Sequence, residues 1–128
     1  MSALSDYAEN KLLDHILSTT AFTAPAAVYL GLSTGSFGDD NSGTELTGNN
    51  YSRVAVTFDS AASGTADNAS AIEFAAATGS WGSISHFGLF DASSGGNLLI
   101  HGAFTAAKTI ASGDVLKIDA GDLDISAD

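Results

Sequence analysis

The chain is organised around one segment, Thr78-Gly-Ser-Trp-Gly-Ser-Ile-Ser-His-Phe-Gly-Leu-Phe-Asp-Ala-Ser-Ser-Gly-Gly-Asn-Leu-Leu-Ile-His-Gly-Ala-Phe104. Two apolar runs flank a small polar hinge at residues 91–97, where a Gly-Gly pair permits positive φ and Asp and Asn can bond to their own backbone. This pattern predicts a β-hairpin. Both arms are apolar at successive positions, which is typical of strands that are covered on both faces. We therefore expect this hairpin at the centre of a β-sandwich.

Length and composition set the class of protein. The 128 residues predict a single domain, 1–128, which is long enough to bury a core. Because the chain has no Cys, neither disulfides nor thiolate metal ligands are expected. Lys and Arg number 4 against 15 Asp and Glu, for a formal net charge of −11. This balance argues against nucleic acid and anionic membranes as partners, and favours a solvated surface over docking on a basic protein.

The first residues show no targeting pattern. Asp6 and Glu9 stand where a signal peptide carries Lys or Arg, and no long apolar region follows. No run approaches the ~18 apolar residues that span a bilayer. We expect a soluble protein that folds in a cytoplasm.

Residues 2–18 predict one α-helix. Asp6 can cap it, and Glu9 three positions later completes a capping box. An apolar stripe follows the helical period and contains Leu4, Ala8, Leu12, Leu13, Ile16 and Leu17. This stripe must pack either on the sheet or on a neighbouring chain, and the sequence leaves both alternatives open.

Short strands account for most of the remaining chain. Apolar and polar residues alternate in 27–33, 51–59 and 70–77, and short strands are expected at 108–110, 115–119 and 122–126. Polar loops separate them at 34–50 and 60–68. The predicted fold is therefore mainly β: an antiparallel β-sandwich, jelly-roll-like or a small barrel, with one N-terminal α-helix.

Metal binding is weakly supported. His86 and His101 lie on the two arms of the hairpin and, with Glu73, could in principle hold zinc. No local ligand spacing supports this, so two hydrogen-bonded strand histidines are the favoured interpretation. The loop at 36–50 offers oxygen ligands for calcium, but a solvated loop is favoured and ion binding stays open: Asp39, Asn41, Ser42 and Glu45.

Catalytic motifs are also weak. The run Gly82-Ser83-Ile84-Ser85 lacks the second glycine of a nucleophile elbow. Gly95-Gly96 is not followed by a helix and does not resemble a phosphate-binding loop. We expect a non-enzymatic protein with no catalytic residue, cofactor or metal.

Three aromatic residues outside the regular apolar runs suggest an interface. Trp81 either caps the sandwich or anchors an interface, and Phe22 and Phe37 lie in loops of small or polar residues. Together with the helix stripe they define the interface candidates, which are Leu4, Leu12, Ile16, Phe22, Phe37 and Trp81.

The chain resembles a family of small tailed-phage proteins, labelled tail-fibre-like or virion structural proteins. The most distinctive part is a Trp81-Gly82 strand that leads into Gly88-Leu89-Phe90-Asp91. Further segments that carry the resemblance are 7–15, 43–46, 51–56, 77–91, 96–99 and 111–118. The resemblance implies an oligomeric component of the virion, assembled in the host cytoplasm, and brings no catalytic residues.

Three functions follow as hypotheses. The first is a head-decoration (cement) protein that binds the major capsid protein as a homotrimer, because the chain predicts one compact domain without a fibrous repeat. The alternative is a tail-fibre or tail-tip adhesin that associates with tail proteins and contacts the host surface through loop 36–50. The third is a carbohydrate-binding domain in which Trp81 and Tyr51 stack on sugars.

Overall fold

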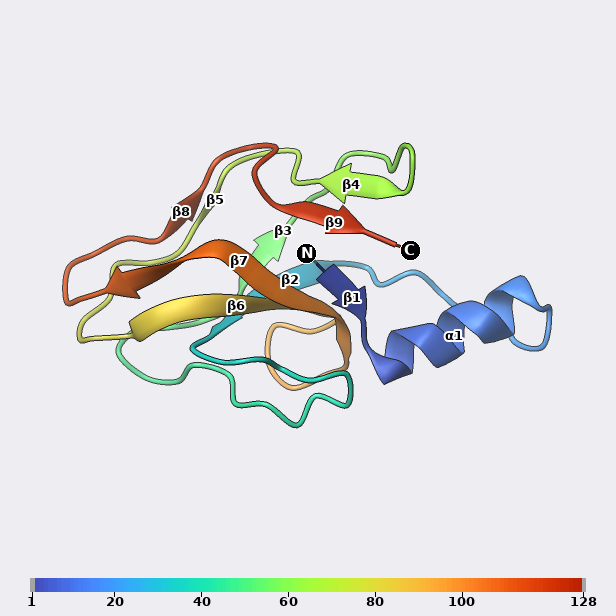
Figure 1. The fold of residues 1–128 in the computed structure, drawn as a ribbon, viewed down its shortest axis with the longest axis horizontal. Coiled ribbons are helices and arrows are strands. Elements are labelled where there is room, and N and C mark those ends of the chain that lie inside the picture. The colour runs from blue at the N-terminus through green and yellow to red at the C-terminus, as the bar shows by residue number, and fades with distance from the viewer. Residues whose placement is uncertain (1, 128) are drawn as a thin grey trace.

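A computed structural model describes residues 2–127 as one helix and nine strands (Figure 1). In chain order these are β1 (Ser2–Leu4), α1 (Asp6–Ile16), β2 (Val28–Ser33), β3 (Val54–Val56), β4 (Thr65–Asp67), β5 (Ile72–Glu73), β6 (Gly82–Phe90), β7 (Leu98–Ile110), β8 (Lys117–Ile118) and β9 (Asp124–Ser126).

The predicted hairpin is β6–β7, and it lies at the centre of the main sheet. This sheet has the order β1-β7-β6-β2-β3, with antiparallel pairing throughout. The hinge closes as predicted: Asp91 Oδ1 accepts a hydrogen bond from the Asn97 backbone N–H at 2.7 Å, and Gly95 and Gly96 have positive φ. Partial burial of Asp91 opposes its ionisation, but the hydrogen bonds from Asn97 outweigh it and lower the pKa of the carboxyl.

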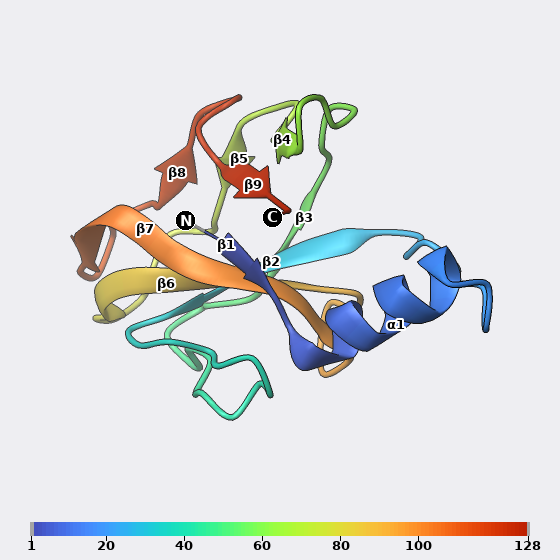
Figure 2. The same ribbon diagram turned by 45° about the vertical axis from the view of Figure 1, so that its right-hand side comes forward.

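Two small sheets, β4–β9 and β5–β8, form a second layer over one face of the main sheet (Figure 2). The main sheet ends at the edge strands β1 and β3 and does not close on itself. The predicted β-sandwich is therefore confirmed, and the small barrel is not formed. The core lies between the layers. The main sheet contributes Leu30, Leu32, Ile84, Phe87 and Leu89, and the second layer and its loops contribute Ile72, Phe74, Leu116, Leu123 and Ile125.

The long loop 34–50 covers the opposite face of the sheet, below it in Figure 2. A second apolar cluster lies here, formed by Phe37, Phe90 and Leu98. Gly88 makes this close packing possible, because a Cβ there would stand 2.9 Å from Leu98 Cδ1 and 3.0 Å from Phe90 Cε2. The sheet is therefore covered on both faces, which explains why both arms of the hairpin are apolar at successive positions.

The N-terminus differs from the prediction. Residues 2–4 are strand β1, in which Leu4 pairs with Ile100 of β7, so the helix begins at Asp6 rather than at residue 2. The N-cap is Ser5, not Asp6: its Oγ accepts the Ala8 backbone N–H at 3.2 Å and donates to the Leu98 carbonyl oxygen. An unpaired edge on β7 recruits these residues into the sheet, and this pairing outweighs their helical pattern.

Several strands are shorter than predicted. The expected strand 51–59 is reduced to β3 and an isolated bridge at Phe58, and 70–77 is reduced to β5. Residues 108–110 are the end of β7, and β8 and β9 lie within 115–119 and 122–126. Strand β4 lies in the predicted loop 60–68. Within residues 2–127, no helix combines the length and the apolar character needed to span a membrane.

Candidate functional site

The structure buries two of the predicted interface residues in the chain itself. Trp81 is 3 % exposed, donates from Nε1 to the Asn49 carbonyl oxygen at 2.9 Å, and meets Tyr51 and Phe74 edge to face. Of the two alternatives for Trp81, this placement is the one in which it closes the sandwich. Phe37 is 1 % exposed and packs edge-on against Phe90. Neither ring offers a surface to a partner in this conformation.

The same placement weakens the sugar-binding hypothesis. Stacking on a sugar requires an exposed ring face. Trp81 is buried, and Tyr51 stacks on Phe74 with a ring separation of 6.2 Å while its hydroxyl is hydrogen bonded within the chain. The two aromatic residues that this hypothesis named are thus both occupied by intramolecular contacts.

Leu4 and Phe22 are half-buried. Leu4 lies in β1, and Phe22 lies in the segment after α1, where its backbone N–H donates to His15 Nδ1 at 3.1 Å. The remaining candidates, Leu12 and Ile16, are exposed on α1 by 38 % and 63 %.

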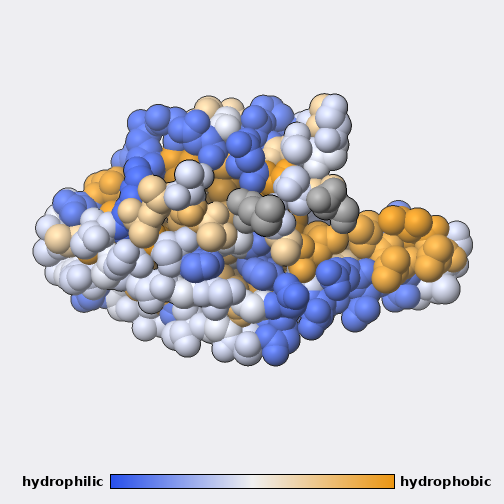
Figure 3. Space-filling model, viewed as in Figure 1, coloured by the Kyte–Doolittle hydropathy of each residue, from blue (hydrophilic) through white to orange (hydrophobic). Residues whose placement is uncertain are grey.

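Leu12 and Ile16 belong to a larger exposed apolar surface on α1. Leu13 and Leu17 lie beside them at 54 % and 68 % exposed, and we call these four residues the helix patch. Among the residues of α1, only Ala8 is buried. Figure 3 shows the hydrophobic surface continuing over the part of α1 that extends away from the body. A contiguous apolar surface of this kind is typical of interaction sites.

The helix patch is exposed because α1 is attached to the sheet at its start. The Ser5 backbone N–H donates to the Leu99 carbonyl oxygen at 2.9 Å, and that of Asp6 donates to the Asp39 carbonyl oxygen at 2.9 Å. Beyond these contacts the helix leaves the sheet (Figure 1). The segment that follows α1 contacts it at His15, but the second half of the stripe stays largely exposed.

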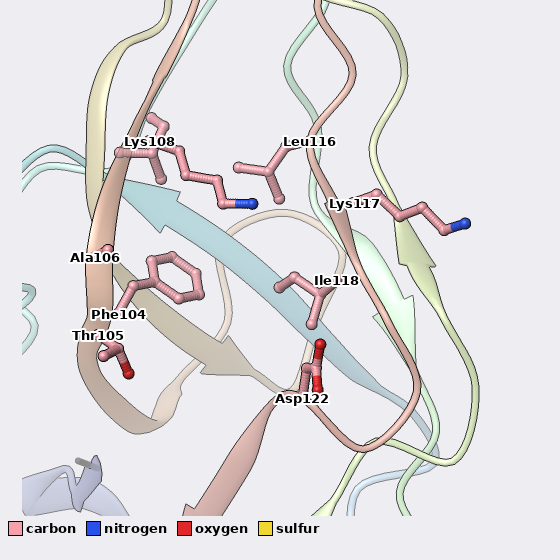
Figure 4. Close-up of a pocket in the computed structure, with 9 residues that line it drawn as sticks. Phe104, Thr105, Ala106, Lys108, Leu116, Lys117, Ile118 and Asp122 are labelled. Carbon is pink, nitrogen blue, oxygen red and sulfur yellow. The ribbon is translucent and has the colours of Figure 1, made fainter.

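A groove of about 320 Å³ lies between β7 and the segment that contains β8 (Figure 4). Its apolar lining comes from Ile84, Phe104, Ala106, Leu116 and Ile118. Charged side chains also line it: Lys108, Lys117 and Asp122. The groove arises because the short β5–β8 pair covers less of the sheet than β7 extends across.

Beneath loop 34–50, a largely buried ion pair joins the loop to the hairpin. We call Glu45, Tyr51 and Arg53 the Arg53 network. The Arg53 guanidinium donates to Glu45 Oε1 and Oε2 at 2.7 and 2.9 Å. It also donates to the carbonyl oxygens of Ala92 and Gly95, both at 2.8 Å, and stands 3.5 Å from the centre of the Phe90 ring. These contacts hold the loop and the hairpin turn against the sheet.

Tyr51 completes the Arg53 network. Its hydroxyl donates to Glu45 Oε2 at 2.5 Å and accepts the Leu32 backbone N–H at 2.9 Å. Burial, followed by the hydrogen bond to Glu45, raises the pKa of Tyr51 far above its ordinary value. This network was not predicted from the sequence: Glu45 and Arg53 are oppositely charged, but no local pattern pairs them.

The residues considered for metal binding have separate partners. His86 pairs with Ala103 and His101 with Gly88, so the two histidines share a face without standing opposite each other. His86 Nδ1 lies 2.7 Å from Ser85 Oγ, and His101 Nε2 lies 2.6 Å from Asp39 Oδ1. Glu73 lies in β5 of the second layer. Across residues 2–127, His, Cys, Asp and Glu nowhere gather in a group of three or more that could hold a metal ion.

The oxygen ligands of loop 36–50 are likewise directed to different partners. Asp39 faces His101 and Glu45 faces Arg53. The Asp40 carboxylate accepts hydrogen bonds from Ser42, which lower its pKa. The calcium hypothesis for this loop therefore lacks a convergent set of ligands among the residues described.

Comparison with known proteins identifies a family whose model matches nearly the whole chain. The family model described as "Podophage GP4 fiber I protein gp80" matches residues 3–126. This match includes the helix patch, the groove and the Arg53 network. The search of curated proteins gave no match.

Proposed function

Because this chain belongs to the podophage GP4 fiber I protein gp80 family, we propose that it acts as a tail-fibre module of the phage particle. Membership makes the chain a structural component of a phage virion. The sequence alone had favoured head decoration over a tail fibre. The family match is the observation that carries the proposal. The family's description names a fibre protein, and the matched region is nearly the whole chain.

The structure is consistent with a mechanical role. A fibre subunit needs a body that keeps its shape and a surface that joins it to its neighbours. The body has a sheet covered on both faces. Within residues 2–127, every buried side-chain nitrogen and oxygen has a hydrogen-bond partner. The helix patch supplies an unoccupied apolar surface for assembly.

We propose a non-enzymatic function, with other copies of this chain and tail proteins as partners. Assembly would contribute free energy by mass action, because the partner binds only the folded module. Contact with the host surface, if this module makes it, would use loop residues such as those at the exposed tip of 39–42 rather than the buried Trp81.

Immunogold electron microscopy of purified virions, with antibody against this chain, tests the proposal. Gold confined to the tail or its fibres is the expected result. Gold spread over the heads would overturn the fibre assignment and restore head decoration. Absence of gold from particles would contradict a virion role altogether. Antibody pre-adsorbed with the purified chain is the control for specific labelling.

A further inference from the structure

We propose that the helix patch of one copy binds in the groove between β7 and β8 of a second copy, so that copies join head to tail. This inference goes beyond the proposed function, because a contact between copies does not depend on where the assembly sits on the particle. It is carried by two surfaces that the chain exposes separately and that match in apolar character and in charge.

The apolar match is direct. Leu12, Leu13, Ile16 and Leu17 project from successive turns on one side of α1, as in helices that bind hydrophobic grooves. The groove lining offers Phe104, Leu116 and Ile118, and Ala106 on the same face of β7 leaves room beside them (Figure 4). A volume of about 320 Å³ is at the lower end of the range for binding pockets and accommodates aliphatic side chains.

The charges also match. The chain contains only four Lys and Arg. Arg53 lies in its network and Lys11 lies on α1 itself, so the cations on the rest of the body are Lys108 and Lys117. Lys117 stands 4.0 Å from the Asp119 carboxylate and its ammonium points away from the groove, so Lys108 is the lysine that points into it (Figure 4). Helix α1 carries more acids than bases, with Asp6, Glu9 and Asp14 against Lys11. An acidic helix that enters the groove gains Coulomb attraction to Lys108, which Asp122 partly offsets.

A chain cannot fill its own groove. The start of α1 is held at Leu98 and Leu99, at the beginning of β7, by the hydrogen bonds of Ser5. The groove lies against residues 104–108, about 20 Å further along the same strand at the rise per residue of β structure. Because α1 extends from the opposite end of the molecule (Figures 1 and 2), its second half points away from the groove.

The contact would be heterologous, since two different surfaces meet. Such contacts build closed rings when the rotation between copies closes, and open filaments when it does not. The homotrimer expected from the sequence would correspond to a ring of three, with each helix patch in the next groove.

A mixing experiment separates this model from its alternatives. Ile16→Asp disables the helix patch, and Ala106→Trp fills the groove; both positions are exposed, so both variants should fold. By sedimentation velocity, the wild-type chain should be oligomeric and each variant alone monomeric, with self-affinity reduced roughly 30-fold or more, as for a hot-spot residue. Mixed together, the variants should form a 1:1 dimer, because one retains the groove and the other the patch.

Three results would overturn the proposal. A monomeric wild-type chain would exclude contact between copies through the patch. Oligomers of Ala106→Trp that match wild type would show that the groove is not used, as when helix patches pair with each other. Variants that stay monomeric on mixing would exclude head-to-tail contact. Circular dichroism of both variants verifies folding, and Thr47→Asp, at an exposed position of loop 34–50, is the matched surface control.

Discussion

The Arg53 network and the helix patch place their side chains against the expectation for their residue types. In the network, a guanidinium and a carboxylate are largely removed from water, with their side chains 7 % and 22 % exposed. In the helix patch, leucine and isoleucine are left in water. The network satisfies its own charges within one chain, whereas the patch is left exposed by the chain. Residue type therefore sets the cost of exposure or burial, and the neighbours available decide which one occurs.

The role of the Arg53 network is better explained as holding segments of the chain in position than as adding to the net stability of the fold. A buried ion pair is costly to desolvate, and its formation is weak evidence for stability. Removing one partner is a different matter, because the other charge then remains buried without compensation. Here the pair binds three segments together: the long loop through Glu45, the strand start through Arg53, and the hairpin turn through the carbonyl oxygens of residues 92 and 95.

The largest effect is expected from Glu45→Gln. This variant leaves the Arg53 charge buried beside a neutral amide and should lower the free energy of unfolding by about 3 kcal/mol. Ile16→Ser in the helix patch, measured at dilution where copies are apart, should change it by less than about 0.5 kcal/mol. Urea denaturation measures both. Equal losses for the two variants would remove the contrast between the network and the patch.

A smaller effect is expected where α1 joins the sheet. Ser5→Ala removes the N-cap acceptor for Ala8 and the hydrogen bond to the Leu98 carbonyl oxygen, so it should cost about 1–2 kcal/mol of stability. Amide hydrogen exchange should increase in α1 more than in β6. Thr20→Ala, at an exposed position beyond the helix, is the control. Faster exchange throughout the sheet instead would show that Ser5 supports the core and not only the helix.

The smallest effect is a pH dependence that arises from Tyr51. Its pKa is raised by burial, so the folded state keeps a proton that the unfolded state releases above its ordinary pKa of ~10. The contribution of Tyr51 to stability is complete below pH ~10 and is lost as the pH rises further, by about 1 kcal/mol near pH 10.5. Tyr51→Phe should have a shallower decline above pH 10 in urea denaturation. Parallel declines would show that other groups cause the loss.

Local patterns predicted much of the architecture. The apolar arms and the glycine hinge of 78–104 placed the hairpin at the sheet centre. The periodicity of residues 2–18 predicted one helix, which forms over Asp6–Ile16. The predicted ends of the helix and strands were wrong where pairing with another strand decides them. Residues 2–4 continue the helical pattern but join β7, because a strand edge was available there. Strands 51–59 and 70–77 alternate over their full length, yet only the parts that face a neighbouring strand form a ladder.

Interface residues were predictable only in part. The helix stripe contained Leu12 and Ile16, and the structure leaves both exposed. Phe37 and Trp81 were chosen because they stand outside the regular apolar runs, but a loop folded over a sheet can bury such residues as fully as a strand does. The groove had no sequence signal, because its lining comes from β6, β7 and the segment around β8, which meet only through the register of the sheets.

The sequence by itself determined the features that depend on neighbours along the chain: the central hairpin, the amphipathic helix, the acidic surface and the mainly β class. The tertiary structure alone decided that Arg53 is buried with Glu45, that Trp81 closes the core, and that the helix patch and the groove lie apart on opposite parts of one molecule. Periodicity and turn chemistry act over a few residues and can be read from the order of amino acids. Burial and ion pairing depend on which distant segments meet, and that is set by the packing of the whole chain.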